Sequence, residues 1–107
     1  MNLNDCQFVA VWEFWVRAGG AERFEAEYGP SGAWAKLFGL DPAYGGTRLI
    51  RDERESRRYL TLDFWASQAA YDLFQRTRAT EYQILDAECE SLTERETEIG
   101  RFTNIFR

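Results

Sequence analysis

One segment, residues 7–16 (QFVAVWEFWV), limits the possible folds of this chain more than any other. It is rich in β-branched and aromatic residues and is followed by the turn sequence RAGG, a pattern typical of a β-strand. Successive side chains of a strand point to opposite faces, and here both faces are apolar except at Glu13. A half-solvated strand would alternate apolar with polar residues. We therefore predict a strand that is covered on both sides.

The apolar patterns of the remaining chain predict alternating helices and strands. Residues 21–28 are predicted to form a helix, Ser31 to cap a short second helix that ends at Gly39, and Ser67 to cap a later one. The other predicted elements are strands at 47–52, 57–65 and 98–105 and a helix at 80–92. The acidic stretch 88–98 is interpreted as a solvated helix end.

This order of elements predicts an α+β fold of the ferredoxin-like βαββαβ type with extra short helices. Such a fold has one four-stranded antiparallel sheet with its helices on one face. By strand alternation, the helix-free face is predicted to carry Val9, Val11, Trp15, Tyr59 and Trp65. An exposed apolar patch of this kind marks an interface or a ligand site. A second copy packed sheet to sheet would cover it, so we expect a homodimer.

Composition excludes several classes of protein. The length of 107 residues predicts a single domain, residues 1–107. With 13 Lys and Arg against 18 Asp and Glu the net charge is −5, and without a basic run the chain is a poor candidate for nucleic-acid binding. No apolar stretch approaches the roughly 20 residues of a membrane helix. The N-terminal sequence lacks the form of a secretion signal, so we expect a cytoplasmic protein without a membrane partner.

The sequence contains no histidine, which removes the usual general base and the common ligand of haem and zinc. Cys6 and Cys89 are far apart and lack the spacing of a metal site. We expect two reduced thiols, with Cys89 packed as a small apolar side chain. No metal and no cofactor is predicted.

The candidate site residues come from a predicted polar and aromatic cavity face. This face is expected to hold Glu13, Trp15, Tyr59, Thr61, Asp63 and Trp65. A carboxylate among aromatic rings has a raised pKa and can act as a base. Glu13 and Asp63 lie on different predicted strands and are expected to approach one another and share a proton.

Aromatic side chains complete the predicted site. Tyr71 or Tyr59 is expected to donate a hydrogen bond to an oxyanion, and Trp65 to stack on a planar substrate. Trp34, in the inserted helix, is expected to cap the pocket. Each role has a structural alternative. Trp34 and Trp65 can be packing residues, and Thr61 can be an ordinary strand residue. Glu13 or Asp63 can form an ion pair with Arg.

Two stretches of the chain resemble antibiotic biosynthesis monooxygenase-like domains. The run FVAVWEFWVRAGGAERFEAEYG resembles their first strand, which ends in a basic-Gly turn and leads into a helix bearing an aromatic residue. The segment YLTLDFWASQAAYDLF resembles their third strand and the helix after it, whereas YGPSGAWAKLF is an extra short helix. The resemblance implies the dimeric α/β barrel fold. Members of the family include cofactor-free oxygenases that act on polycyclic aromatic polyketides, and haem-degrading enzymes.

Residue by residue, the resemblance is partial. The cofactor-free oxygenases present Asn, Trp and Tyr at the positions of Thr61, Trp65 and Tyr71, so the Trp and Tyr are kept and the Asn is not. Their pocket Arg falls near Leu85 and is absent. The helix that carries the axial His of haem degraders holds Gln75 here, so haem degradation by that route is not expected.

Two classes of function follow. The first is an enzyme resembling cofactor-independent monooxygenases, acting on a planar aromatic or small carbonyl compound. The second is a non-catalytic dimeric ligand-binding or stress-associated protein. An open cavity of several hundred cubic ångströms would favour the enzyme. A sealed core with Glu13 and Asp63 both paired to Arg would favour the binding protein.

Overall fold

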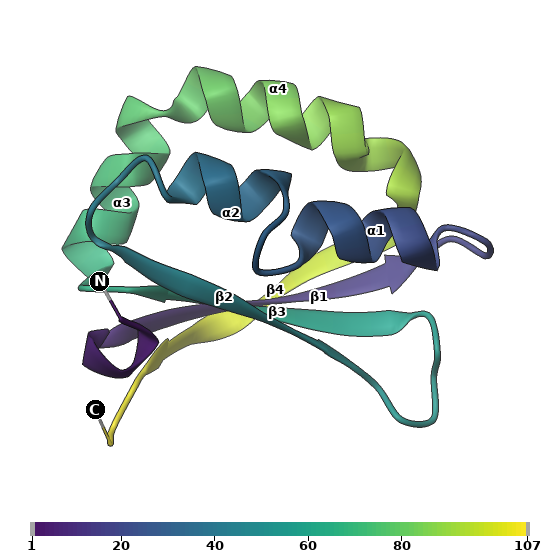
Figure 1. Ribbon diagram of the computed structural model, residues 1–107, viewed down its shortest axis with the longest axis horizontal. Helices are drawn as coiled ribbons and strands as arrows, with labels where there is room; N and C mark the ends of the chain where they lie inside the picture. Colours follow the sequence, from purple (N-terminus) through teal and green to yellow (C-terminus); the bar gives the residue numbers. More distant parts are fainter. Residues whose placement is uncertain (1, 107) are drawn as a thin grey trace.

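The computed structural model describes residues 2–106, which form a four-stranded antiparallel sheet with helices over one face (Figure 1). In chain order the elements are η1 (Leu3–Asp5, 3-10), β1 (Phe8–Val16), α1 (Ala21–Tyr28), α2 (Ala33–Phe38), β2 (Tyr44–Arg51), β3 (Arg58–Trp65), α3 (Gln68–Thr77), α4 (Ala79–Cys89), η2 (Glu90–Leu92, 3-10) and β4 (Thr93–Thr103). The strand order is β2-β3-β1-β4. The predicted ferredoxin-like α+β fold is thus confirmed.

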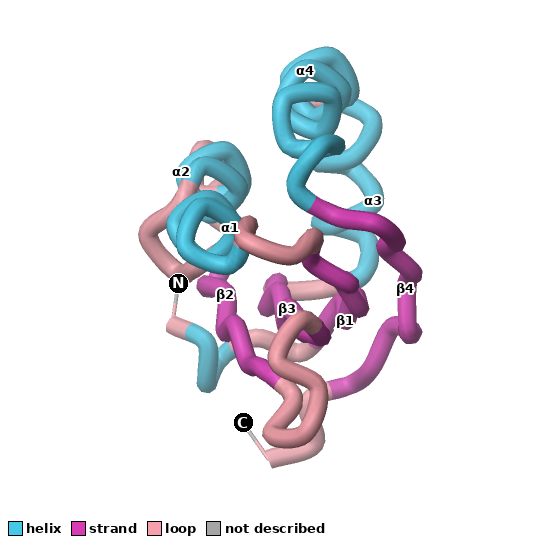
Figure 2. Tube along the Cα trace, turned by 90° about the vertical axis from the view of Figure 1, so that its right-hand side faces the viewer, coloured by secondary structure: helices cyan, strands magenta, loops and turns pink. Residues whose placement is uncertain are grey.

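The helices stand in two groups above the sheet. Figure 2 shows α1 and α2 above β2 and β3, and α4 above β1 and β4. Side chains of both groups meet over β1, where Trp34 of α2 packs edge-on against Tyr82 of α4 with ring centroids 4.9 Å apart. Within residues 2–106, no helix has the length and apolar character needed to cross a membrane.

Local sequence signals set several helix ends. Helix α1 has the predicted bounds, and α2 ends at Gly39 as predicted, although it begins after Gly32 instead of after a Ser31 cap. Ser67 caps α3, because its Oγ accepts a hydrogen bond of 3.1 Å from the backbone N–H of Ala70.

The prediction for the acidic stretch 88–98 is wrong beyond its first residues. Strand β4 begins at Thr93 and pairs with β1 along its whole length. Charged residues stand on both of its faces, so the strand shows no apolar alternation in the sequence. The segment is a strand because its backbone is hydrogen-bonded to β1, although its residues have little preference for strands.

The register between β1 and β3 corrects the predicted faces. Directly opposite residues share a face, and Phe8 pairs with Trp65, Ala10 with Asp63 and Phe14 with Tyr59. The predicted cavity residues of β3 therefore face the helices. Val9, Val11 and Trp15 do lie on the helix-free face, as predicted, but their neighbours there are Leu60, Leu62 and Phe64 instead of Tyr59 and Trp65.

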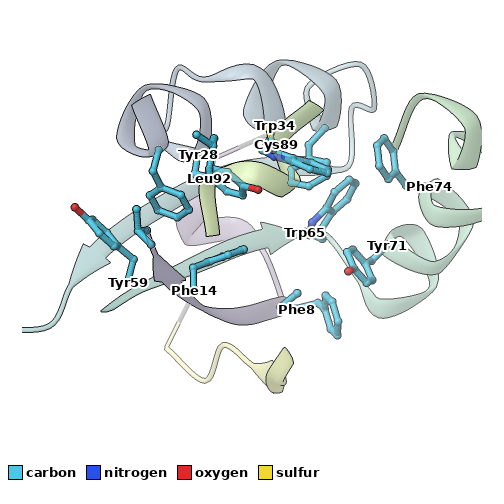
Figure 3. Packing of buried hydrophobic residues seen from close by; sticks show 14 residues of the cluster. Phe8, Phe14, Tyr28, Trp34, Tyr59, Trp65, Tyr71, Phe74, Cys89 and Leu92 are labelled. Atoms are coloured by element: carbon cyan, nitrogen blue, oxygen red, sulfur yellow. The ribbon is translucent and has the colours of Figure 1, made fainter. Parts of the chain in front are cut away.

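The core beneath the helices is largely aromatic (Figure 3). Trp65 is fully buried and lies 5.0–5.6 Å, between ring centroids, from the rings of Phe38, Tyr44, Tyr71 and Phe74. Cys89 is 3% exposed and free, as expected of a packed thiol. On α3 the buried residues are Tyr71 and Phe74. The dense ring packing holds the helix-facing side of β3 in place.

Candidate functional site

A cavity of about 150 Å³ lies between the helix-facing side of the sheet and the helices. All four strands and all four α-helices contribute to its lining. Its wall is mainly aromatic and includes Trp12 and Phe14 of β1, Trp34 of α2, Tyr71 of α3 and Tyr82 of α4. Its polar side chains are Thr47, Thr61, Asp63, Asp86 and Glu96.

The most distinctive group in the cavity is the carboxylate of Asp63. Its residue is 8% exposed, and burial raises its pKa to about 6. Thr47 Oγ1 donates a hydrogen bond of 2.6 Å to Asp63 Oδ1, which opposes this shift only in part. In the described part of the chain no Arg or Lys lines the cavity. Asp63 is therefore a buried acid without a neutralising cation, and such a group is poised for proton transfer near neutral pH.

A short chain of hydroxyls supports this carboxylate. The hydroxyl of Tyr44 lies 2.5 Å from Thr47 Oγ1. When Asp63 is ionised, Thr47 uses its one proton on the carboxylate, so Tyr44 donates to Thr47. Burial raises the pKa of Tyr44 to about 12, which keeps this donor protonated. The chain Tyr44–Thr47–Asp63 thus holds one carboxylate oxygen in a fixed position.

The tyrosines of the cavity are proton donors at neutral pH. Burial raises the pKa of Tyr71, and the negative charge of Asp63 raises it further. The pKa of Tyr82 is also raised, first by burial and then by the charges near it. Tyr71 lies in the same cavity as Asp63, so an acid-base pair of one phenol and one carboxylate is available to a bound molecule.

The structure brings together four of the predicted site residues. Thr61, Asp63, Tyr71 and Trp34 all line the cavity. Trp65 does not line it, because it is fully enclosed by the core rings behind Tyr71. Trp65 is therefore placed as a packing residue, which was the alternative to its predicted role in stacking on a ligand.

The other predicted site residues lie elsewhere. The predicted approach of Glu13 and Asp63 is wrong, because Glu13 is on the helix-free face, where its Oε2 lies 2.7 Å from Nε of Arg58. Trp15 is on the same face, where the guanidinium of Arg95 lies 5.3 Å from the centroid of its ring.

Tyr59 faces the helices at the opposite end of the core from Tyr71, and its hydroxyl donates to Glu25 Oε2 at 2.5 Å (Figure 3). Alternation within a strand is local, whereas the face is set by the register between strands.

Sequence reasoning missed several residues of the cavity. Asp86 and Glu96 are exposed acids of α4 and β4, a pattern that ordinarily indicates a solvated surface. In the sequence, Thr47 is simply a polar residue of a predicted strand and Tyr82 a residue of a predicted helix, so neither indicates a site. Only the folded chain shows that these four side chains face the same space. No group of His, Cys, Asp and Glu among residues 2–106 is arranged to hold a metal ion.

The size of the cavity limits what it can hold. Its volume of about 150 Å³ is below the several hundred cubic ångströms expected for an enzyme pocket. An apolar cavity of roughly 150 Å³ in another protein holds one benzene molecule. The present cavity therefore fits one aromatic ring, and the exposed Asp86 and Glu96 mark its solvent-facing side.

Solved structures with the same fold have low sequence identity to this chain. SnoaB from Streptomyces nogalater, a cofactor-independent oxygenase crystallised as a variant, is 19% identical with a TM-score of 0.74, and the match covers 92% of each chain. A protein of Bordetella bronchiseptica, provisionally named an antibiotic biosynthesis monooxygenase, is 17% identical with a TM-score of 0.75, covering 94% of this chain and 98% of that one. PA3566 from Pseudomonas aeruginosa is 16% identical with a TM-score of 0.68, covering 95% and 97%.

Sequence comparison adds no closer relative, since neither a protein-family model nor a curated protein matches. At these identities the structural likeness establishes the fold alone. The fold is that of antibiotic biosynthesis monooxygenase-like domains, as the sequence resemblance implied.

Proposed function

We propose that this chain, which has the antibiotic biosynthesis monooxygenase-like fold, is a cofactor-independent monooxygenase for a small aromatic or carbonyl compound. The observation that carries the proposal is the buried Asp63 with its raised pKa, which faces an aromatic cavity that no cation lines within residues 2–106. The naming of structural neighbours as monooxygenases supports the same kind of chemistry.

The proposed reaction begins with proton abstraction by Asp63. The carboxylate removes a proton from an activated C–H or phenol of the substrate, and the phenol of Tyr71 donates a hydrogen bond to the oxygen that becomes negative. The substrate anion supplies the electrons that reduce O₂. Overall, one CH₂ group of the substrate and one molecule of O₂ give one C=O group of the product and one molecule of water. Ring packing against Trp12 and Trp34 orients the substrate.

Oxygen consumption tests this proposal. An oxygen electrode would follow the purified protein with one-ring phenols, hydroquinones and small activated carbonyl compounds. We expect turnover that Asp63→Asn lowers by about 10²-fold or more, the usual contribution of a positioned general base. Asp5→Asn is the matched control, because Asp5 is exposed in η1, outside the cavity. Equal turnover in Asp63→Asn and the wild type would overturn the role of Asp63.

A binding protein without catalysis is the second candidate. Thr61 stands where the related oxygenases have Asn, and the cavity is small for an enzyme pocket. Saturable quenching of tryptophan fluorescence by the same compounds, without oxygen consumption or product, would support this alternative.

We also propose that the protein is a homodimer formed through the helix-free face of the sheet. This face carries Leu60, Leu62 and Phe64, which are only partly buried by the chain itself, and Trp15, whose Nε1 is buried without a hydrogen-bond partner. A twofold packing would cover these side chains. Light scattering is the test. We expect a dimer that Leu62→Glu converts to a monomer, whereas a monomeric wild type would overturn the proposal.

A further inference from the structure

We infer that the preferred ligand of this cavity is a one-ring aromatic compound that carries a cationic amine. This inference rests on the proposed function, since it requires that the cavity bind a small molecule. It adds the size and charge of that molecule, neither of which follows from the fold.

The ionised groups that line the cavity are all acids. Asp63 lies on β3, Asp86 on α4 and Glu96 on β4, and no basic side chain of the described residues joins them. Partial burial raises the pKa of Glu96 and the charge of Asp86 raises it further, so these two acids repel one another. A bound ammonium group would relieve this repulsion, whereas a bound carboxylate would add to it.

Two arginines that lie close to cavity residues are paired with other acids. Arg101 lies 5.4 Å from the ring centroid of Tyr71 and pairs with Asp72 at 3.3 Å and Glu98 at 3.5 Å. Arg78, at the start of α4, pairs with Glu81 at 2.8 Å. Both cations are engaged by acids outside the cavity lining, so the negative charge inside the cavity is available to a ligand.

The aromatic wall favours the same class of ligand. Trp12, Trp34 and Tyr82 line the cavity, and aromatic faces pack against a ligand ring and attract an ammonium group even at exposed sites. The hydroxyl of Tyr82 is close enough to Asp63, Asp86 and Glu96 for each of their charges to raise its pKa. Tyr82 therefore lies near both the buried acid and the two exposed acids.

Size and charge together define the ligand. A volume of about 150 Å³ holds one ring. The ammonium group belongs at Asp86 and Glu96, because these acids are exposed and an ammonium beside them keeps part of its hydration. The ring then lies deeper in the cavity, toward Asp63. Polycyclic compounds and aromatic acids are excluded by the same two properties.

Three probes of similar shape and different charge test the inference. These are 2-phenylethylamine, 2-phenylethanol and 3-phenylpropionate, titrated against tryptophan fluorescence near neutral pH at low salt. We expect the amine to bind about tenfold more tightly than the alcohol, and the carboxylate most weakly. In the double variant Asp86→Asn/Glu96→Gln, the preference for the amine should fall to near unity while the affinity for the alcohol is kept.

Glu88→Gln is the matched control, because Glu88 is an exposed acid of α4 outside the cavity. It should keep the full preference for the amine. Equal or tighter binding of the carboxylate would overturn the inference and leave the proposed function standing. Failure of all three probes would also overturn the inference, and oxygen consumption with phenols and carbonyl compounds would then decide the proposed function separately. A preference for the amine that survives the double variant would remove Asp86 and Glu96 as its cause and would also overturn the inference.

Discussion

Thr47 and Asp63 lie directly opposite one another on β2 and β3, and Thr47 Oγ1 donates a 2.6 Å hydrogen bond to the carboxylate of Asp63. This bond favours the ionised acid, whereas burial favours the neutral acid. The pKa of Asp63 is nevertheless raised from 3.8 to about 6, so burial is the larger effect. The site thus keeps a carboxyl group that is less stable as an anion than it would be in water.

Asp63→Asn should stabilise the protein in a pH-dependent way. The pKa of Asp63 is about 6 in the folded state and near 3.8 unfolded, so the folded state binds its proton more tightly. Its contribution to stability is therefore present at pH values below 3.8 and is lost as the pH rises through about 6. Above that pH we expect the variant to be more stable than the wild type by on the order of 2–3 kcal/mol.

Urea unfolding of both proteins across this pH range checks the prediction. The asparagine can keep the bond from Thr47, since its amide oxygen accepts a hydrogen bond. Below about pH 4 the two free energies of unfolding should converge. A difference that does not change with pH would mean that the carboxyl of Asp63 titrates normally.

Thr47→Val should raise the pKa of Asp63 above its wild-type value. The substitution removes the one hydrogen bond that lowers this pKa, and bonds to charged groups contribute about 1.5–3 kcal/mol, or roughly one to two pKa units. A carbon-13 NMR titration of the Asp63 carboxyl would measure the shift. Thr47→Ser is the control, because it keeps the hydroxyl, and it should titrate like the wild type. An unchanged pKa in Thr47→Val would show that the hydroxyl does not stabilise the anion.

Trp65 should behave as a core residue. It is fully buried and surrounded by other rings, so Trp65→Ala should lower the free energy of unfolding by about 3–5 kcal/mol. Trp65→Phe should lower it less and should still bind cavity ligands, because Trp65 does not line the cavity. Thermal unfolding and a ligand titration of the two variants check both points. Loss of binding in a well-folded Trp65→Phe would support the sequence-based ligand role instead.

The Glu13–Arg58 pair should make a modest contribution to stability. Nε of Arg58 lies 2.7 Å from Glu13, and the same guanidinium lies 3.0 Å from Asp52, so Glu13→Gln leaves Arg58 with a partner. We expect a loss of about 1 kcal/mol or less, because the pair is partly exposed. Arg58→Met should cost more, since two carboxylates lose their cation. A double-mutant cycle measured by urea unfolding isolates the pair, and a large coupling energy, of the size that buried ion pairs show, would contradict the prediction.

The local elements could be predicted because their signals are local. The capping hydroxyl of Ser67, the apolar spacing of α1 and the Gly39 stop act within a few residues of chain, and the structure confirms them. The start of β4 at Thr93 could not be predicted in this way. Its charged side chains lie on both faces of the strand, Arg95 opposite Trp15 and Glu96 opposite Phe14, and its backbone is held by β1, which lies far away in sequence.

The sequence by itself determined which residues share a face within each strand, and hence that Thr61 and Asp63 would point the same way. Only the tertiary structure decided which face that was. The pairing of Ala10 with Asp63 turned these residues toward the helices and left Glu13 on the other side. It also brought Asp86 and Glu96 to the same cavity. The physical reason is that alternation repeats within one strand, whereas register and helix packing depend on contacts between distant segments.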